Sequence, residues 1–172
     1  MLDMVFDSCE RANHISTYKK SIYFIEKIRQ RQICNLRLRH YRSAIISCAK
    51  AKKNFEAYSL FNLLKIDEIV PDIRTLKAII LSCNPNNYEM ALKLLKEMKN
   101  FELVPDLGTY DAVLILCQKA GQWKHSVQIF EEALEKNYPI RPTQLKYVFK
   151  VLEAKGRWQE AMVLYDKAKD SG

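Results

Sequence analysis

The chain has 172 residues, of which 48% are apolar and 28% are charged, a composition too hydrophobic for a disordered protein and sufficient for one folded domain. Only four Gly and five Pro leave little room for a turn-rich β architecture. The formal charge of +8, from 28 Lys and Arg less 20 Asp and Glu, favours a polyanionic partner such as nucleic acid or an anionic membrane surface.

The positive charge is concentrated near the start of the chain. Residues 1–50 contain ten Lys and Arg and four Asp and Glu, a net +6 of the total +8. A patch for an anionic partner and an ordinary solvated helix face both account for such a run. A membrane is disfavoured, because the cations are not gathered on one amphipathic helix and no apolar run approaches the roughly 18 residues of a membrane span.

The first residues resemble neither a secretory signal nor a typical transit peptide. Asp3, Asp7 and Glu10 occur where such segments avoid acids. We therefore expect either that an import signal was removed before residue 1 or that the chain is a piece of a longer protein.

The chain repeats itself with a period of 34 to 35 residues, so that Gly121 and Trp123 recur as Gly156 and Trp158. Such a period predicts a solenoid, in which each unit is too small to bury its own apolar face and is stabilised by stacking on its neighbours. We predict one helical-repeat domain over residues 1–172. Its units are 2–37 (degenerate), 38–72, 73–106 (one residue short), 107–141 and 142–172 (truncated at its end).

Each unit is predicted to be a helical hairpin. An apolar face about one helix long occupies residues 41–49, 76–83, 110–117 and 145–152. The second helix carries a stripe of small, large and medium apolar residues at positions i, i+4 and i+7. The small member is Ala57, Ala91, Ser126 or Ala161, the large member is Phe61, Leu95, Phe130 or Tyr165, and the medium member is Leu64, Met98, Ala133 or Ala168.

Polar turns separate the two helices of each hairpin, at residues 50–53, 84–87, 119–122 and 154–157. Their Gly and Asn residues suit the left-handed cap that ends a helix and redirects the chain. Between units, Pro71 and Pro105 end the second helix, and Asp72 and Asp106 are placed to cap the first helix of the next unit.

These residues resemble the pentatricopeptide repeat family, whose unit is a hairpin of about 35 residues that ends in Pro-Asp before a first helix with Thr-Tyr near its start. The best matches are Gly108-Thr-Tyr-Asp111, Lys119-Ala-Gly121, Ser126 to Phe130 and Val104-Pro-Asp106. The resemblance covers residues 38–172, is strong for 73–141 and is weak before 38. A tetratricopeptide array is the nearest competitor, but it expects Trp and Gly in the first helix, where this chain has Tyr110-Asp-Ala-Val113.

The resemblance implies an all-α, right-handed solenoid whose concave groove, lined by the first helices, binds single-stranded RNA, usually in mitochondria or plastids. The family recognises a base with the fifth and final residues of a repeat, while the second residue packs against it. In successive repeats the fifth, final and second residues are Arg42, Asp72 and Arg39, then Lys77, Asp106 and Arg74, then Asp111, Arg141 and Gly108. The last repeat has Lys146 at the fifth position and Thr143 at the second. None is a pair that the family uses, since Asn, Ser or Thr is expected at the fifth position.

Flexible cations at these positions suit phosphates better than bases. A Lys or Arg side chain presents no fixed donor and acceptor pattern, whereas it neutralises phosphate, and phosphate contacts carry no sequence information. We therefore expect an electropositive track, interrupted by Asp111, that consists of Arg39, Arg42, Arg74, Lys77, Lys146 and Lys150. The alternative is that these are ordinary helix-face charges, some of them paired, as Arg42 with Asp72 or Asp111 with Arg141.

No catalytic, cofactor or metal site is predicted. No two of the five Cys have Cys-x-x-Cys spacing, and the three that share one repeat position are too far apart for disulfides, so we predict small core residues in a reducing compartment. They are Cys48, Cys83 and Cys117. The His residues share no repeat position. Trp123 and Trp158 are interpreted as packing residues between hairpins in preference to base-stacking platforms.

Three functions follow as hypotheses. The first is a non-catalytic RNA-binding or RNA-scaffolding member of an organellar ribonucleoprotein, expected in mitochondria, such as a ribosome or RNA-processing complex. It would contact single-stranded or ribosomal RNA mainly through the RNA backbone. The second is a protein-interaction scaffold within a larger organellar assembly. The third is an accessory domain of a longer enzyme.

Overall fold

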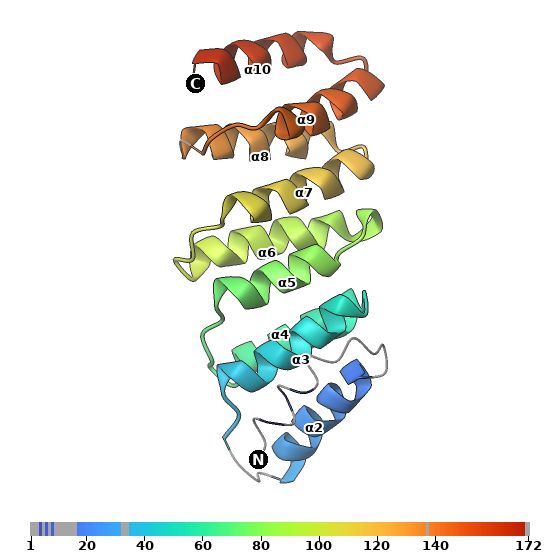
Figure 1. Ribbon diagram of the computed structural model, residues 1–172, viewed down its shortest axis with the longest axis vertical. Helices are drawn as coiled ribbons and strands as arrows, with labels where there is room; N and C mark the ends of the chain where they lie inside the picture. The colour runs from blue at the N-terminus through green and yellow to red at the C-terminus, as the bar shows by residue number, and fades with distance from the viewer. Residues whose placement is uncertain are drawn as a thin grey trace. The chain divides into compact units, whose positions relative to one another are not determined.

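The computed structural model describes Met4, Phe6, Ser8 and residues 17–31, 35–136 and 138–170. These residues form helices joined by turns and contain no strand, which confirms the predicted all-α class. The helices, shown in Figure 1, are α2 (Thr17–Arg31), α3 (Leu38–Lys50), α4 (Asn54–Ile66), α5 (Ile73–Ser82), the 3-10 helix η1 (Pro85–Asn87), α6 (Tyr88–Asn100), α7 (Leu107–Lys119), α8 (Trp123–Glu135), α9 (Pro142–Ala154) and α10 (Trp158–Asp170). The first helix expected in residues 2–37 lies largely outside the described residues.

The chain forms two compact units. Unit 1 comprises residues 1–83 and 96–104, and unit 2 comprises residues 84–95 and 105–172. Residues 73–106, predicted as one repeat, contribute to both units. Each unit has its own core.

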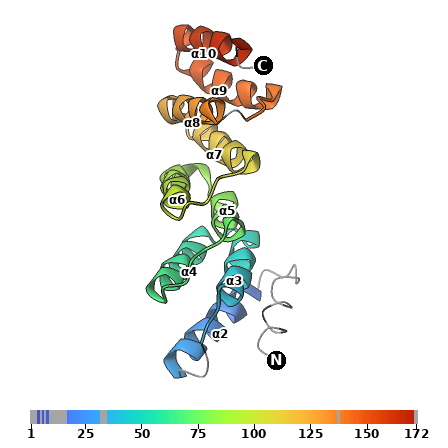
Figure 2. The same ribbon diagram turned by 90° about the vertical axis from the view of Figure 1, so that its left-hand side faces the viewer.

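The core of unit 1 is built around α3, which contacts α2, α4 and α5 (Figure 2). Tyr41 and Ala44 of α3 are fully buried, as is the predicted α4 stripe of Ala57, Phe61 and Leu64. Burial of a large apolar side chain contributes about 1.5–3 kcal/mol relative to its exposure. The buried stripe therefore packs α4 against α3 of its own hairpin and against α5 of the next.

In unit 2, α7 packs against α8 and α9, and α9 packs against α10. The α8 stripe of Ser126, Phe130 and Ala133 is buried, as predicted. The equivalent stripe of α10 is partly open, since Tyr165 remains 52% exposed. A helical hairpin thus buries only part of the apolar stripe of its second helix by itself, and it depends on the next hairpin to cover the rest.

Two first helices begin with the predicted aspartate caps. The Thr75 amide donates to Asp72 Oδ1 at 2.8 Å, and the Thr109 amide donates to Asp106 Oδ1 at 2.8 Å. The hydroxyl of each Thr donates to the same carboxylate oxygen, at 2.6 and 2.7 Å respectively. These bonds satisfy donors that an α-helix leaves unpaired at its first turn.

In the other two first helices the backbone amide of the residue before the helix donates to the side chain of the third helical residue. In α3 the Arg37 amide donates to His40 Nδ1 at 3.1 Å, and in α9 the Arg141 amide donates to Gln144 Oε1 at 3.0 Å. Both side chains are buried. Capping therefore explains a buried histidine for which the sequence pattern offered no role.

Three of the four hairpin turns contain a left-handed residue, and in two of them it is the predicted glycine. Gly121 and Gly156 have φ values of 67° and 64°, and Lys52 takes the same conformation at 57°. The turn at 84–87 does not, which corrects the expectation of an Asn cap there. It forms η1, with Pro85 at its start, because this repeat lacks the residue that would complete the left-handed turn.

We predict that Gly121→Ala lowers the free energy of unfolding by about 1 kcal/mol, because an L-residue at positive φ is strained. The added Cβ would lie 3.7 Å from Lys155 Cε, an ordinary contact, so the loss is attributable to the backbone. Lys52→Gly is the matched control and should leave stability unchanged or raise it. Urea unfolding followed by circular dichroism measures both, and equal losses in the two variants would contradict the backbone explanation.

The cap of α7 gives a second prediction. Asp106→Ala should destabilise unit 2 by about 1 kcal/mol, whereas Asp106→Asn should lose much less, because an Asn side chain also accepts the Thr109 amide bond. Chemical denaturation of the two variants compares them directly. A loss of the same size in both would show that the carboxylate charge, not the cap, stabilises the helix.

Candidate nucleic-acid interface

Four predicted site residues lie on adjacent first helices of unit 1. Arg39 and Arg42 are three residues apart on α3, and Arg74 and Lys77 are three apart on α5, which contacts α3. Arg39 and Arg74 are exposed, while Arg42 and Lys77 are half-buried. The spacing places each pair on one helix face, away from the buried positions. The packing of α3 against α5 therefore brings cations of two repeats into one region.

Arg42 is paired with Asp72, the final residue of its repeat. Its Nη1 lies 2.9 Å from Asp72 Oδ2, while Oδ1 of the same carboxylate caps α5 through Thr75. Burial raises the pKa of Asp72, but the hydrogen bonds from Thr75 and Arg42 outweigh burial and lower the pKa below its usual value. Both carboxylate oxygens are thus engaged within the protein.

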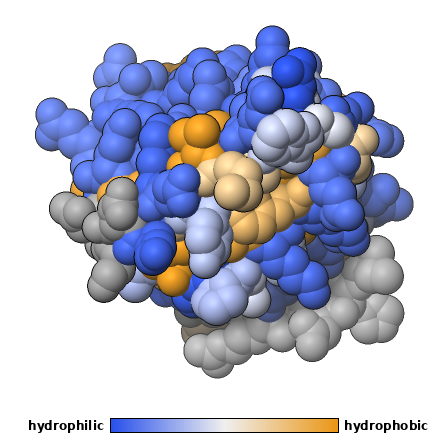
Figure 3. Space-filling view, turned by 90° about the horizontal axis from the view of Figure 1, so that it is seen from above, coloured by the Kyte–Doolittle hydropathy of each residue, from blue (hydrophilic) through white to orange (hydrophobic). Residues whose placement is uncertain are grey.

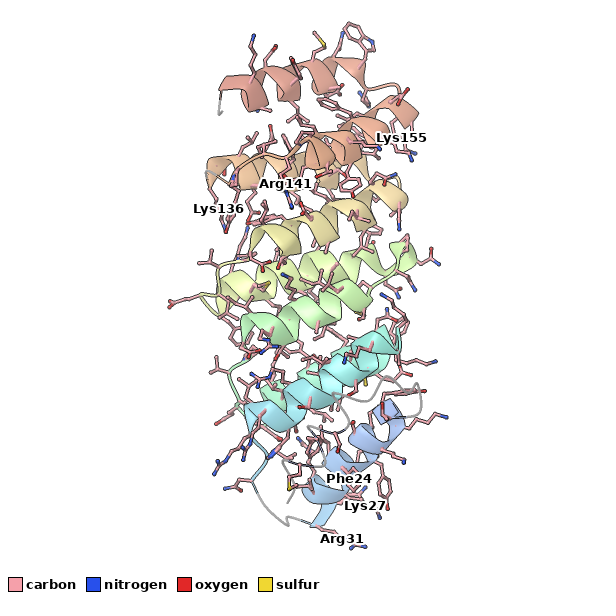
Figure 4. All side chains as sticks on the ribbon, viewed as in Figure 1. Phe24, Lys27, Arg31, Lys136, Arg141 and Lys155 are labelled. Atoms are coloured by element: carbon pink, nitrogen blue, oxygen red, sulfur yellow. The ribbon has the colours of Figure 1, made fainter. Side chains whose placement is uncertain are left out.

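The same pairing occurs in unit 2 with the charges exchanged. Asp111, the fifth residue of its repeat, forms an ion pair with Arg141, the final residue. Asp111 Oδ1 also accepts a bond from Nε2 of the buried Gln144 at 2.7 Å. Figure 4 shows Arg141 at the start of α9, on the side that faces α7. The alternative of in situ pairing therefore holds for both of these pairs.

The third pair of fifth and final residues, Lys77 and Asp106, is divided between the two units. Lys77 belongs to unit 1, whereas Asp106 belongs to unit 2, where it is exposed and caps α7. Lys146 and Lys150 are exposed and lie four residues apart on one face of α9. The involvement of all of these residues in RNA binding stays a prediction.

Sequence inspection missed two tyrosine clusters at the fourth position of a repeat. The Tyr41 hydroxyl donates to Asp67 Oδ2 at 2.5 Å and accepts a bond from Arg29 Nη1 at 3.0 Å. Burial, together with the bond to Asp67, raises the pKa of Tyr41 to about 12. Arg29 is also ion-paired with Asp67, so this member of the basic run ties α2 to α3 and to the end of α4.

The second cluster is in unit 2, where the Tyr110 hydroxyl donates to Glu132 Oε1 at 2.6 Å. Lys136 Nζ lies 5.6 Å from the centre of the Tyr110 ring and 3.6 Å from Glu132 Oε1. The signal in the sequence is the recurrence of Tyr at the fourth position of alternate repeats. Its acidic partner occupies no fixed repeat position, which is why the pattern alone does not identify it.

The cysteines at the shared repeat position are buried and free, as predicted for core residues. Burial raises the pKa of the Cys48 thiol to about 12 and that of Cys83 and Cys117 to about 11, which suppresses the reactive thiolate. In the described part of the chain no group of three His, Cys, Asp or Glu residues could hold a metal ion. No described helix is long and apolar enough to cross a membrane.

The two tryptophans differ in environment. The guanidinium carbon of Arg157 lies 4.7 Å from the centre of the Trp123 ring, so Trp123 packs between successive hairpins, as predicted. Trp158 is 68% exposed, which contradicts the same interpretation for the second tryptophan. The reason is its position on α10, whose outer face no described helix covers.

The sequence matches the family model described as the pentacotripeptide-repeat region of PRORP over residues 1–171. No curated protein matches it. Among solved structures, the PPR domain of Arabidopsis thaliana protein-only RNase P 1, determined in complex with tRNA, has a TM-score of 0.78 at 18% identity, over 96% of this chain and 86% of that one.

Two further structures extend the comparison. Nuclear proteinaceous RNase P 2 of A. thaliana has a TM-score of 0.84 at 16% identity, over 96% of this chain and 37% of its own length. The pentatricopeptide repeat protein PPR10 of maize has a TM-score of 0.63 at 21% identity, over 99% of this chain and 24% of its own. At these identities the likeness concerns the fold. With a family model that covers 1–171 and a fold built of the same hairpins, the chain belongs to the pentatricopeptide repeat family.

Proposed function

We propose that the chain binds RNA along the exposed face of its first helices and holds the phosphate backbone in preference to the bases. The observation that carries the proposal is the pairing of Arg42 with Asp72 and of Asp111 with Arg141. These are the positions with which the family recognises bases, and here they bond to each other. A base would have to break an ion pair to reach them.

The cations that remain exposed are suited to phosphates. We call Arg39, Arg74, Lys146 and Lys150 the first-helix cations; all four lie exposed on α3, α5 or α9. Each neutralised phosphate releases counterions, so binding through them depends steeply on salt and weakly on sequence. The positive charge of the chain supports the same conclusion.

The RNA to test first is a tRNA, because a structural relative was solved with tRNA bound. Single-stranded and ribosomal RNA are the alternatives. We place the protein in a mitochondrial ribonucleoprotein, in keeping with the family, and assign it no catalysis of its own. Since the chain spans 37% of the related RNase P 2, it would fit equally as the RNA-binding region of a longer RNA-processing protein.

Charge reversal tests the role of the first-helix cations. Replacing all four with Glu should abolish binding to a labelled tRNA and to a single-stranded RNA of mixed sequence, measured by fluorescence anisotropy. For the unsubstituted chain, four phosphate contacts at a slope of about 0.7 each predict about 50-fold weaker binding at about 200 mM than at about 50 mM salt. Reversal of four cations that are exposed on the second helices α6 and α8, namely Lys93, Lys96, Lys99 and Lys124, is the matched control.

Two outcomes would contradict the proposal. One is undetectable binding of the unsubstituted chain to either RNA at low salt. The other is an equal loss of affinity in the control variant, since net charge alone would then account for binding.

The substitution Asp72→Asn distinguishes backbone binding from base recognition. Asn preserves the cap of α5 but removes the charge that holds Arg42. We expect about fivefold tighter RNA binding, equivalent to about 1 kcal/mol, with unchanged sequence preference. Competition among homopolymer RNAs measures that preference, and a switch in the favoured base would indicate that Asp72 contacts bases.

A protein-interaction scaffold is the second candidate function. It is favoured by the exposed apolar side chains of α10, among them Trp158 and Met162. Figure 3, which looks onto this end of unit 2, shows apolar residues gathered between polar ones. The two functions use different residues, so one chain can perform both.

A further inference from the structure

Lysine side chains gather where the first hairpin turn of unit 1 meets the start of α2. Residues 17–20 and 50–53 contain five Lys and no Asp or Glu, and all five Lys are exposed. In Figure 1 the start of α2 and the turn between α3 and α4 lie on the same side of unit 1. Lys53 Nζ lies 6.0 Å from the centre of the Tyr18 ring, a contact that joins the two stretches. We call the five residues the turn-edge lysines: Lys19, Lys20, Lys50, Lys52 and Lys53.

Helix electrostatics does not favour the turn-edge lysines of α2 and α4. Lys19 and Lys20 are among the first four residues of α2, whose first turn contains no acid. The dipole of a helix favours anions at this end and opposes cations. Lys53 is the residue before α4 and makes no capping bond with its side chain, although Ser, Thr, Asp or Asn is preferred there. The stability of these helices therefore does not explain why the residues are lysines.

Backbone conformation does not favour lysine at position 52 either. The φ of Lys52 is 57°, close to the values of Gly121 and Gly156 at the equivalent position of two other turns. An L-residue is strained there, whereas Gly is not. Lys52 Nζ donates to the Leu81 carbonyl oxygen at 3.2 Å, which engages one of its three N–H groups and fixes the ammonium at the surface. A strained residue that presents a charge to solvent indicates a function for that charge.

The turn-edge lysines outnumber the acids near them. The acid closest to them in the sequence is Glu56, which is half-buried in the first turn of α4. Lys50 lies in the last turn of α3, where the helix dipole does favour a cation. The other four add positive charge where local structure disfavours it, so an anion bound there would relieve their mutual repulsion.

We propose that the turn-edge lysines hold a second stretch of the RNA backbone, continuous with the first-helix cations. The two groups are connected by α3, because Arg39 and Lys50 are eleven residues apart, about three helical turns, and so lie on one face about 16 Å from each other. An RNA strand along α3 would contact Arg39 at one end and the turn-edge lysines at the other. This proposal rests on the proposed RNA binding and adds the path that the RNA takes across unit 1.

The chemistry of lysine fits a phosphate chain at this place. Each ammonium is a compact charge on a flexible stem, so it neutralises a phosphate without reading a base. A nucleic acid carries its charges at regular intervals along a flexible strand, which suits cations spread over one helix and an adjoining turn. Binding at the turn edge is therefore expected to be sensitive to salt and indifferent to sequence.

Neutralisation of three turn-edge lysines tests the proposal. The variant carries Lys19→Gln, Lys20→Gln and Lys52→Gly. Its binding to a labelled single-stranded RNA of mixed sequence should weaken by about tenfold or more at about 50 mM salt. The slope of log affinity against log salt should fall by about 2, since each lost phosphate contact removes about 0.7.

A control variant with the same loss of charge carries glutamine at three exposed lysines of α6. Its substitutions are Lys93→Gln, Lys96→Gln and Lys99→Gln. It should bind RNA as the unsubstituted chain does. Arginine at positions 19, 20 and 52 preserves the charges and should preserve the affinity.

Stability separates a binding role from a structural one. Removal of cations from the start of α2 and of a side chain from the left-handed position both relieve unfavourable local interactions. Urea unfolding should therefore find the neutralised variant at least as stable as the unsubstituted chain, although it binds RNA more weakly. A loss of affinity that accompanied a loss of stability would show that the lysines support the fold and would overturn the proposal.

The remaining outcomes distinguish this proposal from the proposed function. If the neutralised variant binds normally while reversal of the first-helix cations abolishes binding, only the turn-edge site is rejected. An equal loss in the α6 control would also reject it, since net charge would then explain the effect. Polyglutamate that displaced the RNA as effectively as unlabelled RNA of equal charge would assign the turn edge to an acidic polypeptide. Absence of RNA binding by the unsubstituted chain would overturn both proposals.

Discussion

The structure depends on one constraint: a two-helix repeat has an apolar stripe that its own hairpin covers only in part. On α4 and α8 the stripe is completed by the first helix of the next hairpin, and Phe61 and Phe130 are fully buried there. On α10 the equivalent Tyr165 stays half open. Stacking of one hairpin on the next is thus a main source of stability.

Stacking also decides what the first helices present to a ligand. It sets the fifth residue of a repeat beside the residue that precedes the next first helix, close enough for the ion pairs Arg42–Asp72 and Asp111–Arg141. Asp72 serves at once as a helix cap and as a counter-ion. In these two repeats the fifth and final residues therefore bond to each other, while Arg39, Arg74, Lys146 and Lys150 stay exposed on the first helices. For this reason we propose that the chain holds the RNA backbone in preference to the bases.

The sequence predicted the helices well because their signals are local. The apolar stripe, the proline and the aspartate each act within a few residues, and the caps of α5 and α7 confirm the aspartate signal. The turn at 84–87 was predicted wrongly, since a single missing residue replaces a left-handed turn by η1. Trp123 and Trp158 occupy the same repeat position, yet one is covered by Arg157 and the other is exposed. Repeat position alone cannot report what a neighbouring hairpin covers.

The sequence by itself determined the helical class, the hairpin pattern, the buried cysteines and the placement of cations where the family expects small polar residues. Those properties follow from residue type and spacing along one chain. Only the tertiary structure decided that Arg42 and Asp111 are paired and that Tyr41 joins Arg29 to Asp67. Each of these pairings depends on the distance between side chains that are far apart in the sequence, and that distance is set by how the hairpins stack.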